Sequence, residues 1–435
     1  MSDKLKGKRA RLIPVVGTRM AREAEQRATS AFLAVLSIVR DFSKDLLNPM
    51  GASSAKKATV DTYTEVSMDE VRPDGLIRVT WGKQVFTALV EVKTGNNNLD
   101  RDQLKRYLQL ARKKKYQHLI TISNEIAPPR GHPVQGLGIT ANSRVKITHL
   151  SWFKILSTAL RLKNHKGVDD PEQAWILEEL VRYMQHDASG VLPLADMGAS
   201  WRLIRDGARN STLHHQTEEL NEVARKIDEM HEFAALQLST EIGRDVIVQH
   251  SRAFGESHPR RIASFAKDMI AGRPILSQFR IPDTAGPVST AIDLKAQHMT
   301  ASIEVMAPGN VKALGRINWI LRQLGKAPDK AIVETYSKGA RKPLSATLES
   351  VRADRSRKVL LGEKKSEAHR FVVRLQEKIQ MGRKASRHHP GFIEGYMTLI
   401  TKFYDEVIQD LTAWQPPAPK RIVEADEAET EVPMD

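Results

Sequence analysis

Two short stretches decide the expected fold: Arg72-Pro73-Asp74-Gly75, and further along the chain Leu89-Val90-Glu91-Val92-Lys93. Glu91 and Lys93 are separated by one residue, so on a β-strand their side chains leave the same face of the sheet. Val90 and Val92 then point to the opposite face. The pattern predicts an apolar strand that ends with two charged side chains standing together.

The sequence around these stretches predicts an α/β domain, in which a mixed sheet is flanked by helices. Gly82 and Lys83 separate two extended segments and are typical of a hairpin turn. Apolar residues at three- and four-residue steps predict the helices, and β-branched or alternating segments predict the strands. The expected helices are 19–47 and 99–115, and the expected strands are 60–66, 76–81, 85–92, 118–123 and 145–150.

Beyond this domain the sequence predicts a mainly helical connection and a second, α+β domain of unknown role. Asp170 followed by Pro171 is typical of a helix start. The last residues are Pro-rich and then acidic, a composition that predicts disorder. The expected organisation is a basic N-terminal arm at 1–18, the α/β domain at 19–163, a helical connecting region at 164–239, the α+β domain at 240–414 and a disordered acidic tail at 415–435.

The composition narrows the classes of function. The 435 residues include 67 Lys plus Arg against 52 Asp plus Glu, a formal charge of +15 that favours a polyanionic partner such as a nucleic acid. The chain contains no cysteine, which excludes disulfides, thiolate metal sites and a Cys nucleophile. No apolar stretch has the length of a membrane span or a signal region, so we expect no membrane partner and a cytoplasmic protein.

The charged strand end has the residue types of a metal site. Asp74, across the hairpin from Glu91, is placed to offer a second carboxylate to the same cation. Carboxylate and carbonyl oxygens are the ligands that Mg²⁺ prefers. Lys93 would then orient a water molecule or offset charge at phosphorus, while Gln103 and Tyr107, one helical turn apart, would face and support the site.

These residues together resemble the PD-(D/E)XK nuclease superfamily, whose domain is restriction-endonuclease-like. The pattern is carried by Pro73-Asp74, by Glu91-Val92-Lys93 and by the helix segment from Gln103 to Tyr107. The resemblance implies that Asp74 and Glu91 bind Mg²⁺ or Mn²⁺, that the carbonyl of Val92 is a further ligand and that Lys93 acts on the nucleophile. It covers about a third of the chain, and the remainder is matched to nothing.

Two further groups of residues are assigned on this basis. Members of the superfamily often add a glutamate from the first helix; Glu25 fits that role best, with Glu23 as second choice. The helix after the motif is rich in Lys and Arg, which would suit phosphate contacts or would otherwise be a solvated helix face. The residues expected to contact nucleic acid are Lys105, Arg106, Tyr107 and Arg112.

The first functional hypothesis is a metal-dependent nuclease that hydrolyses phosphodiester bonds, in DNA, with roles in DNA repair or phage defence equally compatible. The alternative is a catalytically inactive nuclease-fold protein that acts as a DNA-binding or assembly scaffold. A third possibility is an effector with another activity in residues 240–414, where no phosphate loop, nucleophile elbow or metal-ligand helix is found. The strandedness of the substrate stays open, as does a homodimer or a protein partner bound through the second domain.

Overall fold

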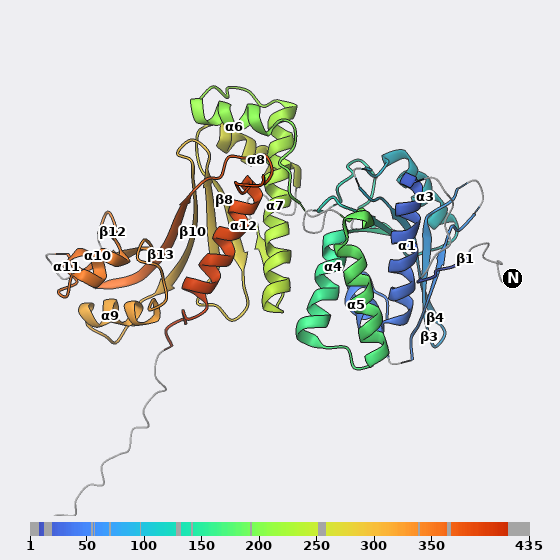
Figure 1. Ribbon diagram of the computed structural model, residues 1–435, viewed down its shortest axis with the longest axis horizontal. Helices are drawn as coiled ribbons and strands as arrows, with labels where there is room; N and C mark the ends of the chain where they lie inside the picture. The colour runs from blue at the N-terminus through green and yellow to red at the C-terminus, as the bar shows by residue number, and fades with distance from the viewer. Residues whose placement is uncertain are drawn as a thin grey trace, which may run out of the picture. The chain divides into compact units, whose positions relative to one another are not determined.

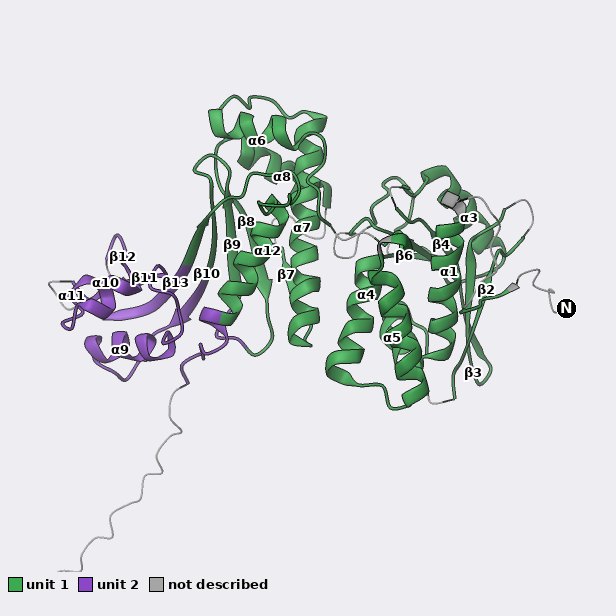
Figure 2. Cartoon of the chain, viewed as in Figure 1, with its two compact units in different colours: residues 1–283, 287–302, 375–405 green, residues 284–286, 303–374, 406–435 purple. Residues whose placement is uncertain are grey.

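The computed structural model divides into two compact units (Figure 2), and each is considered by itself. Unit 1 comprises Met1–Asp283, Pro287–Ser302 and Leu375–Asp405; unit 2 comprises Thr284–Gly286, Ile303–Arg374 and Glu406–Asp435. The structure describes residues 8–12, 20–53, 55, 57–68, 71–95, 97–127, 132–140, 142–191, 194–250, 258–337, 340–362 and 367–415. The acidic tail expected at 415–435, except Gln415, and most of the expected basic arm lie outside these residues.

The first sheet of unit 1 is mixed, as the sequence predicts, and its strands follow one another in chain order. Figure 1 labels β1, β3 and β4 of this sheet. The pairs from β1 to β4 are antiparallel, whereas β4, β5 and β6 run parallel to one another. The predicted two-residue hairpin turn at Gly82 and Lys83 is present, since Trp81 pairs with Gln84. The strands are β1 (Lys8–Arg9), β2 (Thr59–Thr64), β3 (Gly75–Trp81), β4 (Gln84–Val92), β5 (His118–Ser123) and β6 (Lys146–Ser151).

Helices cover both faces of this sheet, so side chains on both faces are buried. Val90 and Val92 pack in a core with α1, α2, α4 and α5, whereas Leu89 packs in a second core with α3. This alternation places Glu91 on the α3 face. The bounds are α1 (Met20–Ile38), α2 (Arg40–Leu47), η1 (Asn48–Met50), α3 (Arg101–Lys113), α4 (Trp152–Arg161), η2 (Leu162–Lys166), α5 (Pro171–Gln185) and η3 (Asp187–Ser189).

The prediction of one long helix over 19–47 is wrong, because the helix breaks at Val39. Val39 has an extended backbone, φ −87° and ψ 103°, and starts α2 without a side-chain cap. The residue is fully buried, and so are Phe32 and Phe42 on either side of it, whose rings meet edge to face with centroids 6.2 Å apart. The break redirects α2 so that its apolar side also reaches the core, a tertiary effect that the uninterrupted apolar period does not reveal.

The rest of the chain forms an antiparallel sheet with helices, in agreement with the expected α+β class. The strand order is β12-β11-β13-β10-β9-β8-β7. None of the helices in the described part of the chain combines the length and apolar character needed to cross a membrane. The bounds are α6 (Trp201–Asn210), α7 (Glu218–Ile242), β7 (Ile247–Gln249), α8 (His258–Ile270), β8 (Ile275–Arg280), β9 (Val288–Asp293), β10 (His298–Met306), α9 (Ala313–Gln323), β11 (Ile332–Ser337), β12 (Leu344–Thr347), α10 (Leu348–Ala353), α11 (Lys358–Leu361), β13 (Ala368–Lys378), α12 (Phe392–Phe403) and η4 (Tyr404–Ile408).

A buried ion pair joins α7 to α8 within unit 1. Arg261 donates from Nε and Nη2 to the two carboxylate oxygens of Asp228, at 3.0 and 2.9 Å. The two side chains are only 1% and 2% exposed, and Nε2 of His258 lies 3.3 Å from the same carboxylate. Burial opposes ionisation of Asp228, but His258 and Arg261 outweigh it and hold the pKa of Asp228 well below its usual range.

Gly75 is required where β3 passes beneath α1. A Cβ atom at this position would lie 2.6 Å from Cδ1 of Leu33 and 3.2 Å from the carbonyl oxygen of Tyr63. We expect Gly75→Ala to lower the free energy of unfolding by about 1 to 3 kcal/mol through overpacking, measured by urea denaturation. The matched control is Gly325→Ala, since a Cβ there meets nothing closer than 3.7 Å; an equal loss in both variants would contradict the packing argument.

Candidate active site

Asp74 and Glu91 come together because β3 and β4 are antiparallel neighbours. Gly75 pairs with Val90, so the residue before β3 lies beside the end of β4. The carboxylate of Asp74 is fixed there, since its Oδ2 accepts the main-chain N–H of Val92 at 2.8 Å. The predicted pairing of two carboxylates is therefore present in the structure.

The Lys93 ammonium lies within this group of acids. Its Nζ is 2.6 Å from Oε1 of Glu91, 3.1 Å from the carbonyl oxygen of Val92 and 3.6 Å from Oε1 of Glu25. The Glu91 side chain is 1% exposed, and those of Lys93 and Glu25 are 16% exposed. Residues from α1, from the start of β3 and from the end of β4 thus meet at one largely buried point.

The proximity of these charges shifts their protonation equilibria. Burial, and then the charge of Asp74, raises the pKa of Glu91 to about 8, although Lys93 acts in the opposite direction. Burial alone would lower the pKa of Lys93, but Glu91, with help from Asp74 and Glu25, raises it. Lys93 therefore stays protonated and positively charged, whereas the Glu91 carboxyl holds its proton more strongly than an ordinary glutamate does.

One oxygen of this cluster is left without a partner. Oε2 of Glu91 is buried and accepts no hydrogen bond from the described residues. A proton on the Glu91 carboxyl, or a cation beside it, would satisfy this buried oxygen, and the raised pKa of Glu91 favours the proton when no metal is bound.

Of the two glutamates considered on the first helix, the structure places Glu25 at the site and turns Glu23 away from it. Oε1 of Glu25 approaches Lys93, whereas the Glu23 carboxylate pairs with Arg27 one turn along α1. The placement follows from the α1 period, which brings Glu25 into line with the buried residues Ala28 and Phe32.

Gln103 and Tyr107 lie behind the carboxylates. Nε2 of Gln103 donates to the Tyr107 hydroxyl at 3.0 Å, and that hydroxyl donates to the carbonyl oxygen of Arg72 at 3.0 Å. This chain ties α3 to the segment that carries Asp74. Burial, with the negative charge of Glu91, raises the pKa of Tyr107, so the hydroxyl stays a donor. The ring is 3% exposed, and the direct nucleic-acid contact expected for Tyr107 does not fit this burial.

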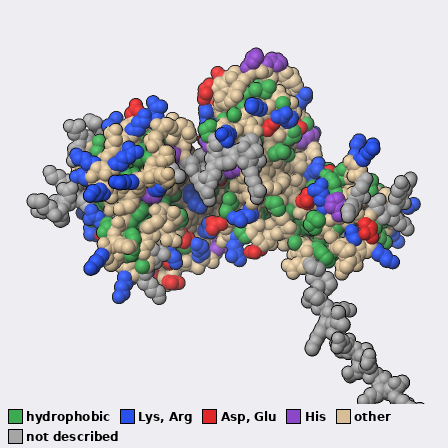
Figure 3. Space-filling model, turned by 180° about the vertical axis from the view of Figure 1, so that it is seen from behind, with side chains coloured by type: hydrophobic (Ala, Val, Ile, Leu, Met, Phe, Trp, Pro, Cys, Tyr) green, Lys and Arg blue, Asp and Glu red, His purple; other side chains and the backbone are tan. Residues whose placement is uncertain are grey.

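The basic residues of α3 lie on its solvent side. Arg106 and Arg112 are exposed, and the Lys105 side chain is 44% exposed and within 3.8 Å of Asp102. Leu104, Leu108 and Ala111 cover the sheet from the other side of the helix. Figure 3 shows Lys and Arg side chains gathered on the lobe that carries the first sheet. These cations are accessible to a polyanion.

Sequence reasoning missed the residues that fix the backbone after Glu91. The Trp152 indole Nε1 donates to the carbonyl oxygen of Lys93 at 2.8 Å, and Nδ2 of Asn124 donates to the carbonyl oxygens of Gly95 and Gly190 at 2.9 and 2.8 Å. The N–H of Gly95 donates to the carbonyl oxygen of Gly190 at 2.8 Å. These contacts join segments far apart in the chain, and no local motif marks them.

A second missed feature continues from Glu91 across the sheet. Thr121, paired with Glu91, has its hydroxyl 2.8 Å from Nε2 of His132 and 3.0 Å from Nδ1 of His149. Nε2 of His149 donates to the carbonyl oxygen of Glu125 at 2.8 Å, so the hydroxyl donates to His149 and accepts from His132. Burial lowers the pKa of His132 to about 4 and that of His149 to about 3. Both rings are neutral, and they hold the loop after β5 against the strand beside Glu91.

The donors gathered here are few. Within the described residues, no group of three or more His, Cys, Asp or Glu side chains is arranged to hold a metal ion. The set expected from the sequence needs only two such side chains, Asp74 and Glu91, with the Val92 carbonyl as the third donor. These three donors lie around Lys93. Three protein donors are enough for Mg²⁺, because this cation keeps several waters in its coordination shell.

Comparison of the chain with protein-family models, with curated proteins and with solved structures finds no match.

Proposed function

We propose that this protein is a metal-dependent nuclease that hydrolyses phosphodiester bonds in DNA, with a restriction-endonuclease-like domain as its catalytic part. The observation that carries the proposal is the meeting of Asp74, Glu91 and Lys93 at one buried point, with a Glu91 oxygen left unpartnered. The order of these residues along the chain, and the helix with Gln103 and Tyr107 that follows, support the same class.

The residues fit a divalent cation. Burial of Glu91, and then the charge of the neighbouring Asp74, raises the pKa of Glu91, and a divalent cation held by both carboxylates would offset both effects. The Lys93 ammonium lies in hydrogen-bonding contact with Glu91 and with the Val92 carbonyl, two of the three proposed ligands. It thus acts as a stand-in for the Mg²⁺ or Mn²⁺ that Asp74, Glu91 and the Val92 carbonyl would hold.

The cation and the side chains of the protein would have different roles in the proposed reaction. When bound, the cation supplies Lewis-acid activation of the phosphodiester and of a water nucleophile. With the cation bound, Lys93 would orient the attacking water and offset charge at phosphorus. Glu25, beside Lys93, keeps a negative partner for the ammonium. Tyr107 and Gln103 fix the Arg72 carbonyl and so hold Asp74 in place.

The substrate class follows from the charge of α3. Arg106 and Arg112, with Lys105, present exposed cations on the helix that also supports the carboxylates. Phosphate contacts of this kind position a strand without reading its sequence. DNA is therefore the proposed partner, and a second copy of the chain or a protein partner stays an open proposal.

The proposal is tested by incubating plasmid, linear duplex and single-stranded DNA with wild-type and Lys93→Ala protein, in Mg²⁺, Mn²⁺ or chelator. We expect cleavage by the wild type alone, abolished by chelator, and the substrate that is cut identifies the strandedness. If no lane shows cleavage and both proteins bind DNA equally, the nuclease proposal fails and a DNA-binding scaffold takes its place.

Metal binding is expected to release a proton. Because the pKa of Glu91 is about 8, its carboxyl is mostly protonated at pH 7 and must lose that proton to bind a cation. We expect nearly one proton released per Mn²⁺ at about pH 7 and almost none at about pH 9.5, with affinity rising over the same range. Isothermal titration calorimetry in buffers of different ionisation enthalpy measures this number. Release that does not change with pH would contradict the prediction.

Loss of the Asn124 contacts is expected to slow cleavage without weakening metal binding. Asn124→Ala removes two hydrogen bonds that hold the backbone after Lys93, and misplaced catalytic groups lower rates about 10- to 100-fold. We expect a fall of that size in kcat, with KM and the Kd for Mn²⁺ nearly unchanged. Asn210→Ala, an exposed asparagine on α6, is the control. A rise in KM alone would show that Asn124 acts on substrate binding instead.

A further inference from the structure

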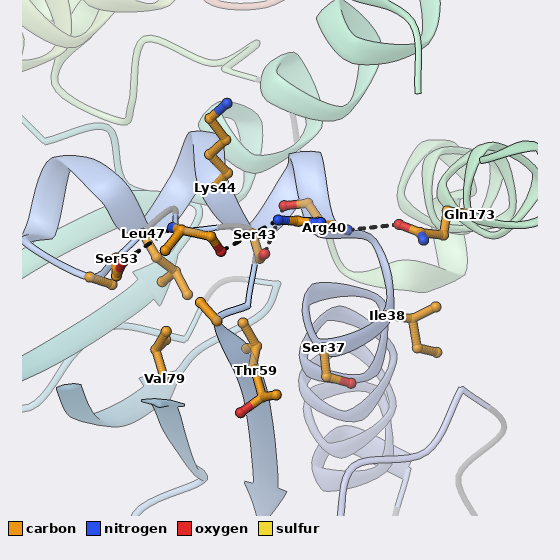
Figure 4. A pocket seen from close by; sticks show the side chains of 14 residues that line it. Ser37, Ile38, Arg40, Ser43, Lys44, Leu47, Ser53, Thr59, Val79 and Gln173 are labelled. Carbon is orange, nitrogen blue, oxygen red and sulfur yellow. Dashed lines mark hydrogen bonds between the residues drawn. The ribbon is translucent and has the colours of Figure 1, made fainter. Parts of the chain in front are cut away.

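A cavity of about 340 Å³ opens where α1 ends and α2 begins, at the opposite end of α1 from Glu25. Ile38 and Arg40 line it, and so do Thr59 of β2 and Val79 of β3 (Figure 4). The 13 residues from Glu25 to Ile38 span about 20 Å of helix. The cavity is therefore separate from the candidate active site, and nothing proposed above uses it.

Its floor is apolar. Leu47, Ala52 and Val79 are 3%, 3% and 1% exposed and belong to the core between the sheet and the helices, so the cavity reaches from the surface down to that core. Its volume lies at the lower end of the range of small-molecule sites, about 300 to 1,000 Å³. The flat face of one nucleobase would pack on such a floor.

Its upper wall is cationic and rich in hydroxyl groups, and none of its lining residues is acidic. Arg40 lies across the opening, held by Gln173, whose Oε1 accepts its main-chain N–H at 2.9 Å, and by a long contact of 3.4 Å from Nη2 to the Ala55 carbonyl oxygen. The acid nearest in sequence to Lys44, Asp45, is engaged with Lys166 at 2.6 Å. Ser43 donates to the Arg40 carbonyl, which leaves its hydroxyl oxygen able to accept.

We propose that this cavity binds a phosphate group carried on a nucleoside, with the base on the apolar floor and the phosphate on Arg40. A guanidinium is the side chain best suited to phosphate, because its planar N–H groups bind two oxygens at once. The phosphate belongs either to a free mononucleotide or to the end of a nucleic-acid strand. Both sources present the same chemistry to the cavity, and the inference stands whether or not the protein is a nuclease.

The test is calorimetric titration of the full chain in chelator, so that the candidate metal site takes no part. The probes are adenosine 5′-monophosphate, adenosine, inorganic phosphate and a 5′-phosphorylated tetranucleotide. We expect one molecule of the monophosphate per chain, with adenosine and inorganic phosphate each at least about tenfold weaker. Saturable binding of the tetranucleotide alone would assign the phosphate to a strand end, and saturable binding of neither would overturn the inference.

Three variants tie the binding to the cavity. Arg40→Gln is expected to weaken it about tenfold, the loss of a charge-assisted hydrogen bond. Ala58→Leu should abolish it by filling the space, because Ala58 lines the cavity. Lys83→Gln is the matched control, since Lys83 is exposed in the turn between β3 and β4 and does not line the cavity. Equal effects of Arg40→Gln and Lys83→Gln would show general charge attraction and overturn the inference, as would binding that survives Ala58→Leu. Binding unchanged by Lys93→Ala separates this cavity from the candidate active site.

Discussion

Replacing Glu91 by glutamine is expected to eliminate DNA cleavage while leaving the protein at least as stable as the wild type. Glutamine keeps the shape of the side chain but removes the negative charge that would hold the cation, and we expect cleavage to fall by about 10³-fold or more. The folded protein loses little, because its Glu91 is a buried acid whose ionisation is opposed by burial and by Asp74.

The raised pKa of Glu91 also determines whether the free energy of unfolding rises or falls with pH. The folded pKa of about 8 lies above the ordinary value of 4.5, so between these values the folded state holds a proton that the unfolded state has lost. The free energy of unfolding of the wild type therefore falls as pH rises through this window, and Glu91→Gln removes that fall. Single-turnover cleavage and urea unfolding at about pH 5 and about pH 8.5 measure both effects. A variant that is equally active, or whose stability falls with pH as the wild type does, would contradict the assignment.

Removing Asp228 is expected to destabilise the protein more than any other single change considered. Asp228→Ala leaves Arg261 charged, buried and unpaired, and breaking a buried pair in this way costs about 3 to 5 kcal/mol. Because the folded pKa of Asp228 is lowered, its contribution is present above the unfolded pKa and is lost as pH falls below it. Thermal and urea unfolding at neutral and acid pH measure the loss.

Two further variants isolate the buried charge as the cause. Asp268→Ala breaks the pair with Arg273, whose side chain is 63% exposed, and such pairs contribute about 0 to 1 kcal/mol. Asp228→Leu combined with Arg261→Met removes both charges and should recover most of the stability. A similar loss in the surface variant, or no recovery in the double variant, would place the destabilisation in packing rather than in the unpaired charge.

The sheet and the meeting of Asp74, Glu91 and Lys93 could be predicted from the sequence because both follow from local rules. Alternation fixes the face of Glu91, and the hairpin at Gly82 fixes which residue of β3 lies beside it. The break at Val39 could not be predicted, since the apolar period continues through it and the packing of Phe32 against Phe42 across the break is a tertiary contact.

The residues that support the site could not be predicted from the sequence either. Asn124 and Trp152 reach Gly95 and Lys93 only because β5 and β6 run parallel to β4, and pairings between distant segments leave no local signal. The same holds for the hydroxyl of Thr121 and its two histidines. The assignments of catalysis and of metal binding stay predictions.

The position of the Lys93 ammonium against Glu91 and the Val92 carbonyl has a kinetic consequence. At the proposed metal site, Mg²⁺ would take the position that the Lys93 ammonium holds beside Glu91 and the Val92 carbonyl. If the ammonium leaves before the cation binds, the observed loading rate would reach a plateau at high metal concentration. Without metal, the chain itself supplies the cation beside Glu91.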